Sequence, residues 1–540
     1  MSQETDERYV AIRGTETNLM PGTRMIGPSD PGQKIEVTLV LRRRSSAPAI
    51  PKPEDIGAQL PRDRQYITRE SFGAVYGAEH DHVVKVEDFA RASGLTVLRS
   101  SSAKRTITLA GSRADVSAAF RVNVMELSDK YGSYLGYKTP IRVPVELASI
   151  VTSVFGLEDR VLACPQVRSL AHEDVVRMGP LPALQIYTGP QVAELYNFPN
   201  ASGQGECIGI IEFGGGYDLT DVMGYFQNLG LAVKPNSISY VSLGGVTNKP
   251  GLSAFLDTEV YLDVEVAGSV ASQARLTVYF APPTTNGFVD AFSTAIHDPV
   301  NKPSVIFCTW GAFELLWQGM PSAMAELEVY FQEAAALGVT IVVASGDSGA
   351  TAGVHNDGPH LYYPGSSPNV LSIGGTSLFS SAGSVVREST WNRLLTGGGA
   401  STGGFSRVFQ LPPYQRGPNR AVSTVGRGVP DACADADPFT GYLIRVYWYH
   451  AVIAGTSAAA PLWAALIARI NELLGVPVGY FNPLIYGKLA SGGVFNDVTL
   501  GNNGLFAAGP GWDACTGWGS PDGVKLLQAL GGTRAANKDN

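Results

Sequence analysis

Regular spacing of apolar residues near the start of the chain predicts a small mixed unit. The first such run is apolar at every second position, as in a half-buried strand: Ile35, Val37, Leu39 and Leu41. Residues 83–93 fit a helix that Gly94 ends. Further strands are predicted over 106–110 and 121–125, with a helix after Ser112. This order favours a split βαβ, ferredoxin-like α+β arrangement.

The apolar pattern changes beyond residue 200. Short continuous apolar runs, each ended by Gly, Pro or polar residues, cover 207–213, 274–280, 304–309 and 339–344. Such runs are typical of strands in a parallel sheet that helices cover on both faces, and such sheets carry their sites at the carboxyl ends of the strands. A polar stretch with two prolines separates the patterns. We therefore expect an α+β domain over 1–170, a linker over 171–185 and an α/β domain over 186–540.

Composition agrees with a large globular protein. The chain has 540 residues, 44% of them apolar and 16% charged, and this length exceeds what one core usually serves. A net charge of -8 argues against nucleic acid as a partner. No apolar run approaches the roughly 18 residues of a membrane span, and the first residues, MSQETDERYV, contain no apolar h-region. The five cysteines are widely spaced, so neither a disulfide framework nor a zinc site is expected.

The sequence GTSAAAP, residues 455–461, offers a candidate nucleophile. A serine at a glycine turn just before a helix has an exposed Oγ, and backbone N–H groups nearby can bind an oxyanion. Ser457 holds this position. The alternative is that Thr456 and Ser457 only cap the helix that follows.

The base that would activate Ser457 is not an obvious histidine. None of the seven histidines has the helix-opening context of a subtilisin-type base. Glu259 and Asp263 lie four residues apart on a predicted helix that runs to about Ala267, so both side chains share one face. If buried, they would share a proton and titrate as a pair at low pH. The alternative is an ordinary pair of solvated surface carboxylates.

Two further motifs carry acidic side chains. SGDSG, residues 345–349, presents Asp347 at a strand end, where its protonated form would donate to an oxyanion; the alternative is an acid in a glycine-rich turn. Activity should then fall as pH approaches neutrality. Near the C-terminus, Asp497 precedes a glycine-rich loop, AGPGWD, that contains Asp513. Oxygen donors of this kind suit calcium, although such loops are usually only turns.

These motifs, TEVYLD, SGDSG, GTSAAAP and FNDVT with AGPGWD, occur in the order found in the sedolisins, and the chain most resembles their kumamolisin branch. The resemblance implies an activation propeptide followed by a subtilisin-like peptidase domain. It implies that Ser457 is the nucleophile, Glu259 the general base, Asp263 its orienting partner and Asp347 part of the oxyanion hole. It also implies one structural Ca²⁺, held by the following residues: Asp497, Val498, Gly509, Gly511 and Asp513.

The resemblance extends to a supporting network and has one departure. Glu212 and Trp310 match positions that extend the hydrogen bonds behind Glu259; the alternatives are a strand-end acid and a core aromatic residue. Tyr362 stands where the branch has an acid after SGDSG. That acid would favour a basic side chain on the acyl side of the cut, so this preference is not expected here.

We therefore predict a secreted, monomeric, acid-active serine-carboxyl endopeptidase that acts on proteins or peptides. We expect it to be made as a self-processing zymogen that its own propeptide inhibits. The chain would cut itself between about residues 169 and 186. The main alternative is a catalytically inactive protein with the sedolisin fold that has a binding or structural role. An α/β-hydrolase esterase would need a GxSxG elbow, and dinucleotide binding would need GxGxxG, which GGG at 214–216 does not supply.

Overall fold

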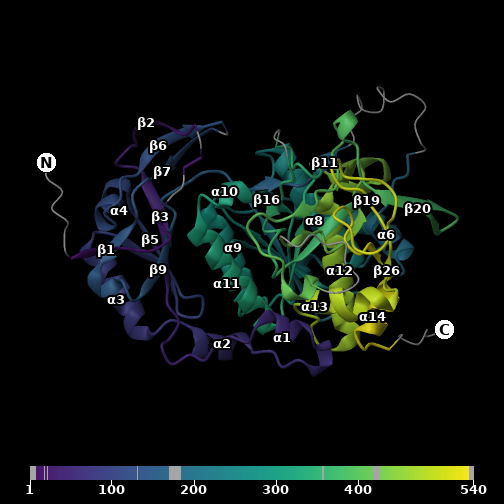
Figure 1. Ribbon diagram of the computed structural model, residues 1–540, viewed down its shortest axis with the longest axis horizontal. Coiled ribbons are helices and arrows are strands. Elements are labelled where there is room, and N and C mark those ends of the chain that lie inside the picture. Colours follow the sequence, from purple (N-terminus) through teal and green to yellow (C-terminus); the bar gives the residue numbers. More distant parts are fainter. Residues whose placement is uncertain are drawn as a thin grey trace.

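The computed structural model describes residues 8–16, 19–20, 22–130, 132–169, 184–354, 358–416 and 426–533. A smaller N-terminal unit lies beside a larger one, with helices α9 (Thr285–Ile296) and α11 (Pro321–Leu337) of the larger unit facing the N-terminal sheet (Figure 1). None of the helices in these ranges is both long and apolar enough to cross a bilayer.

The N-terminal unit contains a four-stranded antiparallel sheet in the order β4-β5-β3-β9. Its elements are β3 (Lys34–Leu41), α3 (His80–Ala92), β4 (Thr96–Ser101), β5 (Thr106–Ser112), α4 (Arg113–Ala119) and β9 (Val151–Phe155). One face packs under α3 and α4 around Leu39 and Leu109. The chain order and strand order are those of the predicted ferredoxin-like fold.

The predicted strand over 121–125 is wrong. Arg121 has φ 50°, which ends α4 in a left-handed turn, and the next strand, β6 (Met125–Asp129), joins a side sheet with β2 (Arg24–Pro28) and β7 (Gly132–Gly136). The fourth strand of the main sheet is β9 instead. Smaller elements complete the unit: β1 (Tyr9–Ala11), α1 (Pro53–Gly57), α2 (Arg69–Tyr76) and β8 (Arg142–Pro144).

The larger unit is built on an eight-stranded sheet in the order β13-β14-β12-β15-β17-β19-β20, with β23 also paired to β19. Its strands are β12 (Cys207–Glu212), β13 (Ile238–Ser242), β14 (Arg275–Phe280), β15 (Val305–Cys308), β17 (Thr340–Ala344), β19 (Leu371–Ser381), β20 (Ser384–Thr390) and β23 (Ala432–Asp435). All pairs are parallel except β19–β20. The four predicted apolar runs are confirmed as β12, β14, β15 and β17.

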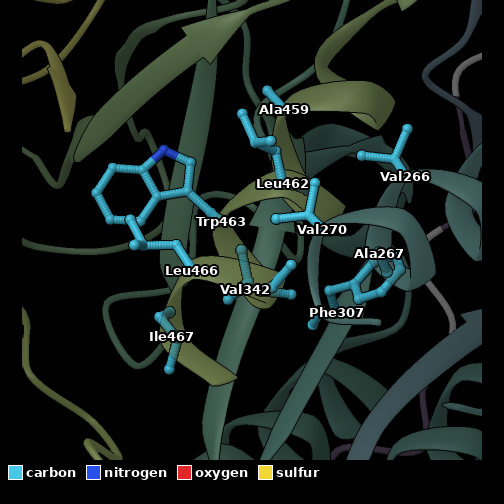
Figure 2. Close-up of a cluster of buried hydrophobic side chains, with 14 of the residues drawn as sticks. Val266, Ala267, Val270, Phe307, Val342, Ala459, Leu462, Trp463, Leu466 and Ile467 are labelled. Atoms are coloured by element: carbon cyan, nitrogen blue, oxygen red, sulfur yellow. The ribbon is translucent and has the colours of Figure 1, made fainter. Parts of the chain in front are cut away.

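Helices cover both faces of this sheet, as predicted. Alternate residues of each strand enter different cores: Ile210 packs with α8 (Ala254–Val270) and α12 (Thr456–Leu474), whereas Ile211 packs with α9 and α11. Figure 2 shows part of the first core, where side chains of α8 and α12 meet Phe307 and Val342 of the sheet. The packing of α8 against α12 brings their polar residues to one place.

The second face of the N-terminal sheet is covered by the larger unit. Val40 of β3 joins the core formed by α9 and α11, and Thr38 Oγ1 donates to Asp290 Oδ1 of α9 at 3.4 Å. Arg105, which follows β4, donates to Glu326 of α11 at 2.7 Å and to Glu333 at 3.2 Å. The N-terminal sheet is therefore buried on both faces.

Candidate active site

Ser457 lies where strand β25 (Tyr449–Ala454) turns into α12. Gly455 makes the turn with φ 106°. A Cβ at Gly455 would lie 2.3 Å from the carbonyl oxygen of Gln166 and 2.5 Å from Asp347 Oδ2, so only glycine fits. Ser457 Oγ donates to Glu259 Oε1 of α8 at 2.6 Å, across the α8–α12 contact. The predicted nucleophile and base are thus hydrogen-bonded to each other.

A row of buried carboxyl groups continues behind Glu259. Asp263, one helical turn further along α8, accepts from Thr309 Oγ1 at 2.9 Å and interacts electrostatically with Glu212 at the end of β12. Glu212 Oε2 in turn accepts from Trp310 Nε1 at 2.8 Å. The side chains of Glu212, Glu259 and Asp263 are fully buried, so the interpretation of Glu259 and Asp263 as solvated surface carboxylates is wrong. Trp310 is both a core aromatic residue and a donor to this network.

Burial controls the protonation of this row. Desolvation raises the pKa of Glu212 and of Asp263 well above their usual values, and the neighbouring acids raise both further. Both shifts favour the uncharged form of these two carboxyl groups. Burial also raises the pKa of Glu259, to about 8, whereas the hydrogen bond from Ser457 opposes the rise. The donor Ser457 favours the ionised form of Glu259, which is the form that can accept a proton.

Asp347 follows β17 and faces the same turn. Its Oδ1 accepts from the backbone N–H and the Oγ1 of Thr456, both at 2.8 Å. Its Oδ2 is buried and has no hydrogen-bond partner within the described ranges, although Arg168 Nε lies 3.6 Å away. Burial raises the pKa of Asp347 to about 7, against the opposing effects of Arg168 and Thr456. An uncharged carboxyl group here would have a proton free to donate.

The chain's own residues 164–169 cross the site, which the sequence did not predict. Strand β10 (Cys164–Pro165) pairs antiparallel with β16 (Trp310–Phe313), and β11 (Arg168–Ser169) pairs antiparallel with β25. Between them, Gln166 donates its backbone N–H to the Thr309 carbonyl at 3.2 Å. Its own carbonyl accepts the N–H of Ser457 at 3.1 Å. No local signal in CPQVRS marks this placement, because the pairing depends on distant strands.

Tyr362, the departure noted in the sequence, lies beside Asp347. It belongs to β18 (Tyr362–Tyr363), which pairs with β16, and its ring covers Gly346. Its hydroxyl donates to the carbonyl of Ala352 at 3.1 Å. Burial raises the pKa of Tyr362 to about 12, so the side chain brings no negative charge to the site.

The residues predicted to bind calcium come together in a loop near the C-terminus. Asp497 Oδ2 accepts the N–H of Gly511 at 2.8 Å, and Asp513 Oδ2 accepts the N–H of Gly509 at 3.0 Å. The carbonyl of Val498 is close to this loop, 3.4 Å from Thr516 Oγ1. In the described ranges no group of three or more His, Cys, Asp or Glu side chains is placed to hold a metal. Any cation here would therefore depend largely on carbonyl oxygens.

Comparisons with known proteins identify the family. The family described as "Pro-kumamolisin, activation domain" matches residues 21–160, and the family described as "Subtilase family" matches residues 244–475. Kumamolisin from Bacillus sp. (strain MN-32) is 43% identical, over 97% of this chain and 97% of its own. The chain belongs to the sedolisin family of serine-carboxyl peptidases. It is accordingly a serine peptidase with an activation propeptide and a subtilisin-like domain.

Other sedolisins agree with this assignment. Sedolisin from Pseudomonas sp. (strain 101) is 30% identical, over 86% of this chain and 81% of its own. The solved structure of Pseudomonas sedolisin with two molecules of pseudo-iodotyrostatin has a TM-score of 0.58 and 28% identity, and covers 65% of this chain and 99% of that one. Membership of the family excludes the α/β-hydrolase and dinucleotide-binding alternatives.

Proposed function

We propose that this sedolisin is an acid-active endopeptidase with Ser457 as nucleophile and Glu259 as general base. The observation that carries the proposal is the 2.6 Å hydrogen bond from Ser457 Oγ to Glu259 Oε1 in a buried site. A nucleophile bonded to a base that further groups orient is the arrangement needed for covalent catalysis. Asp263 and Glu212, with Thr309 and Trp310 as donors, would hold that base in place. The retention of all these groups argues against an inactive relative.

The proposed reaction proceeds through an acyl-enzyme. Ser457 Oγ attacks the peptide carbonyl while Glu259 accepts its proton. The oxyanion accepts one hydrogen bond from the backbone N–H of Ser457 and another from the protonated Oδ2 of Asp347. Both donors lie on the same side of the Gly455 turn. Glu259 then gives its proton to the leaving amine. Water, activated by Glu259 in the same way, releases the acyl group as an acid.

The pH dependence follows from Asp347. Its carboxyl group donates to an oxyanion only when protonated, and as a carboxylate it would repel the developing charge. Since burial raises the pKa of Asp347 to about 7, the protonated form dominates below that pH and is lost above it. Activity should therefore fall as pH rises through about 7. Glu259 must be ionised to accept the serine proton, and burial raises its pKa to about 8, so the ionised form becomes scarcer as pH falls and limits activity on the acid side.

The zymogen proposal has support in the N-terminal unit. We assign residues 1–170 as the propeptide and 186–540 as the peptidase domain, with the propeptide as an intramolecular inhibitor. Residues 164–169 lie where a substrate would pair, between β16 and β25, and so exclude one. Of the expected linker over 171–185, residues 171–183 lie outside the described residues.

A structural Ca²⁺ would fit the C-terminal loop. The residues proposed to hold it are the side chains of Asp497 and Asp513 and the carbonyls of Val498, Gly509 and Gly511. The donors are all oxygen, which suits a hard cation, and the two carboxyl groups already draw the loop together through Gly509 and Gly511. Bound there, the ion would neutralise two acids and stabilise the loop.

We further propose that the enzyme acts as a monomer outside the cell on proteins or peptides. The requirement for a protonated Asp347 supports an acidic environment, which secretion into such a medium would provide. Tyr362 supports the absence of a preference for basic side chains on the acyl side, because it brings no carboxylate to the site.

The test is proteolysis of a denatured protein across about pH 2 to 8, with acid-incubated protein and its Ser457→Ala variant. We expect the wild type to shorten itself in acid and to degrade the substrate, and the variant to do neither. Cleavage that persists in the variant would exclude Ser457 as nucleophile. No cleavage by either protein at any pH would favour the inactive relative.

A further inference from the structure

Strand β25 leads from a surface turn to Ser457, and one of its edges is only partly covered. On one side, β24 (Tyr442–Val446) pairs with β25 over residues 449–453. On the other side, β11 covers Ala454 and Ile453 alone. In the described ranges no strand pairs with this second edge between Tyr449 and Val452. An unpaired strand edge is a template on which an extended chain can add a strand.

The propeptide residues in the site show how a chain runs onto this edge. The carbonyl of Gln166 accepts the N–H of Ser457 at 3.1 Å, and the second and third residues after it lie opposite Ala454 and Ile453. Antiparallel partners run one residue against one residue. A substrate bound in the same register, once the propeptide has left, would therefore place its fourth to seventh residues beyond the cut opposite residues 452 to 449.

The far end of this edge has two exposed aromatic side chains. Tyr449 is 77% exposed, and Trp448, which precedes it in the turn, is 55% exposed. Five residue steps of an extended strand separate Tyr449 from Ala454, a distance of about 17 Å. Side chains of directly opposed residues lie on the same face of a sheet, so the seventh substrate residue would contact Tyr449. An aromatic ring offers such a residue a large apolar surface.

The turn that carries these aromatic residues is fixed to the body of the peptidase domain. The N–H of Trp448 donates to Oδ2 of the buried Asp221 at 2.9 Å. Arg445 pairs with Asp221 at 2.7 Å, and its guanidinium lies 4.8 Å from the centre of the Trp448 ring. The hydroxyl of Tyr447 donates to Asp257 of α8. Because the turn is already ordered, a ligand that contacts it loses little free energy to ordering it.

We propose that the edge of β25 from Val452 to Tyr449, together with Trp448, is an extended binding site for the part of a polypeptide substrate beyond the cut. This inference rests on the proposed function, because Ser457 has to act on the chain that is bound there. The preferred substrate is an unfolded stretch that reaches seven residues beyond the cut and has an apolar side chain at its end. Denatured proteins offer such stretches, whereas short peptides end before the aromatic turn.

The test uses peptides built on a cut that the acid-activated enzyme makes in a denatured protein, located by mass spectrometry. All peptides share the acyl side and the first three residues beyond the cut. One peptide ends there, and two extend to seven residues, with leucine or serine at the seventh position. We expect kcat/KM of the leucine peptide to exceed that of the short peptide about ten-fold, and that of the serine peptide to lie between them.

A backbone test shows whether the peptide pairs as a strand. In an antiparallel pair, only alternate N–H groups of a chain point toward its neighbour. N-methylation of successive nitrogens from the fourth to the seventh residue should therefore lower kcat/KM at every second position.

Two enzyme variants test the aromatic turn. In Tyr449→Ser, the advantage of the leucine peptide over the short peptide should fall to about two-fold, and leucine and serine peptides should be cut alike. The matched control is Tyr240→Ser, because Tyr240 is 49% exposed but lies on β13, the edge strand of the main sheet. This control should keep the ten-fold advantage.

Three results would overturn the inference. If the wild type cuts the short and long peptides equally well, substrates do not use the edge of β25, while the proposed function stands. If the long peptides are favoured but Tyr449→Ser keeps the full advantage, the length effect arises at another surface. If the wild type cuts neither the denatured protein nor any peptide, the proposed function fails and this inference fails with it.

Discussion

Replacing Arg168 by glutamine in the precursor should extend self-cleavage to higher pH. The guanidinium of Arg168 lies against Asp347, with Nε 3.6 Å from Oδ2 and Nη2 3.2 Å from the backbone carbonyl. This cation lowers the pKa of Asp347 and so favours the carboxylate, which cannot donate to an oxyanion. Glu259 and the neutral Tyr362 also face Asp347 and remain in the variant. Removing the guanidinium of Arg168 should therefore keep Asp347 protonated to a higher pH.

The size of the shift follows from Coulomb's law. Two unit charges at the 3.6 Å separation interact by about 1 kcal/mol in a dielectric of about 80 and by about 2 kcal/mol at about 40. The side chain of Arg168 is 36% exposed, so the more aqueous value is appropriate. About 1 kcal/mol corresponds to a little under one pH unit. The upper midpoint of self-cleavage should rise by roughly that amount.

The assay measures the fraction of precursor cut after a fixed time across about pH 4 to 9. A matched control is Arg91→Gln, because Arg91 lies on α3 of the same unit, is 62% exposed and pairs only with neighbouring acids of its own helix among the described residues. The control should keep the wild-type midpoint. An unchanged or lowered midpoint in Arg168→Gln would refute the electrostatic role of Arg168.

Three further changes test the site. Trp310→Phe leaves Glu212 Oε2 without its donor, which costs about 1–3 kcal/mol. We therefore expect kcat to fall about ten-fold and the acidic side of the pH–activity profile to change. The control Trp317→Phe removes a buried N–H with no partner in the described ranges, and it should change neither kcat nor the profile. Asp347→Asn supplies a donor at every pH, so the loss of activity near pH 7 should disappear from its pH profile. A chelator should lower Tm by about 2–8 °C, and Asp513→Asn should do the same and abolish the chelator's effect, as measured by thermal unfolding.

Local patterns predicted the parts of this molecule that depend on neighbours in sequence. Continuous apolar runs located β12, β14, β15 and β17, since a strand buried on both faces needs apolar residues on both. The four-residue spacing of Glu259 and Asp263 predicted their common face on α8. The contact of Glu259 with Ser457 follows from the packing of α8 on α12.

Features that depend on distant pairing were not predicted. The strand expected over 121–125 has apolar residues, but the left-handed turn at Arg121 directs the chain away from the main sheet, and β9 takes the position. Likewise, residues 164–169 have no strand pattern of their own. They become strands only because β16 and β25 offer free edges on either side of Ser457.

The two-sided burial of the N-terminal sheet has a consequence for the direction of activation. Val40 and Phe155, whose partners are α9 and α11, complete a core that the propeptide shares with the peptidase domain. After release, these side chains would face water, at a cost of about 1.5–3 kcal/mol for each large apolar residue. We therefore expect the freed propeptide to unfold readily and to become a substrate of the enzyme it restrained. Its destruction would remove the inhibitor permanently and make activation a one-way step.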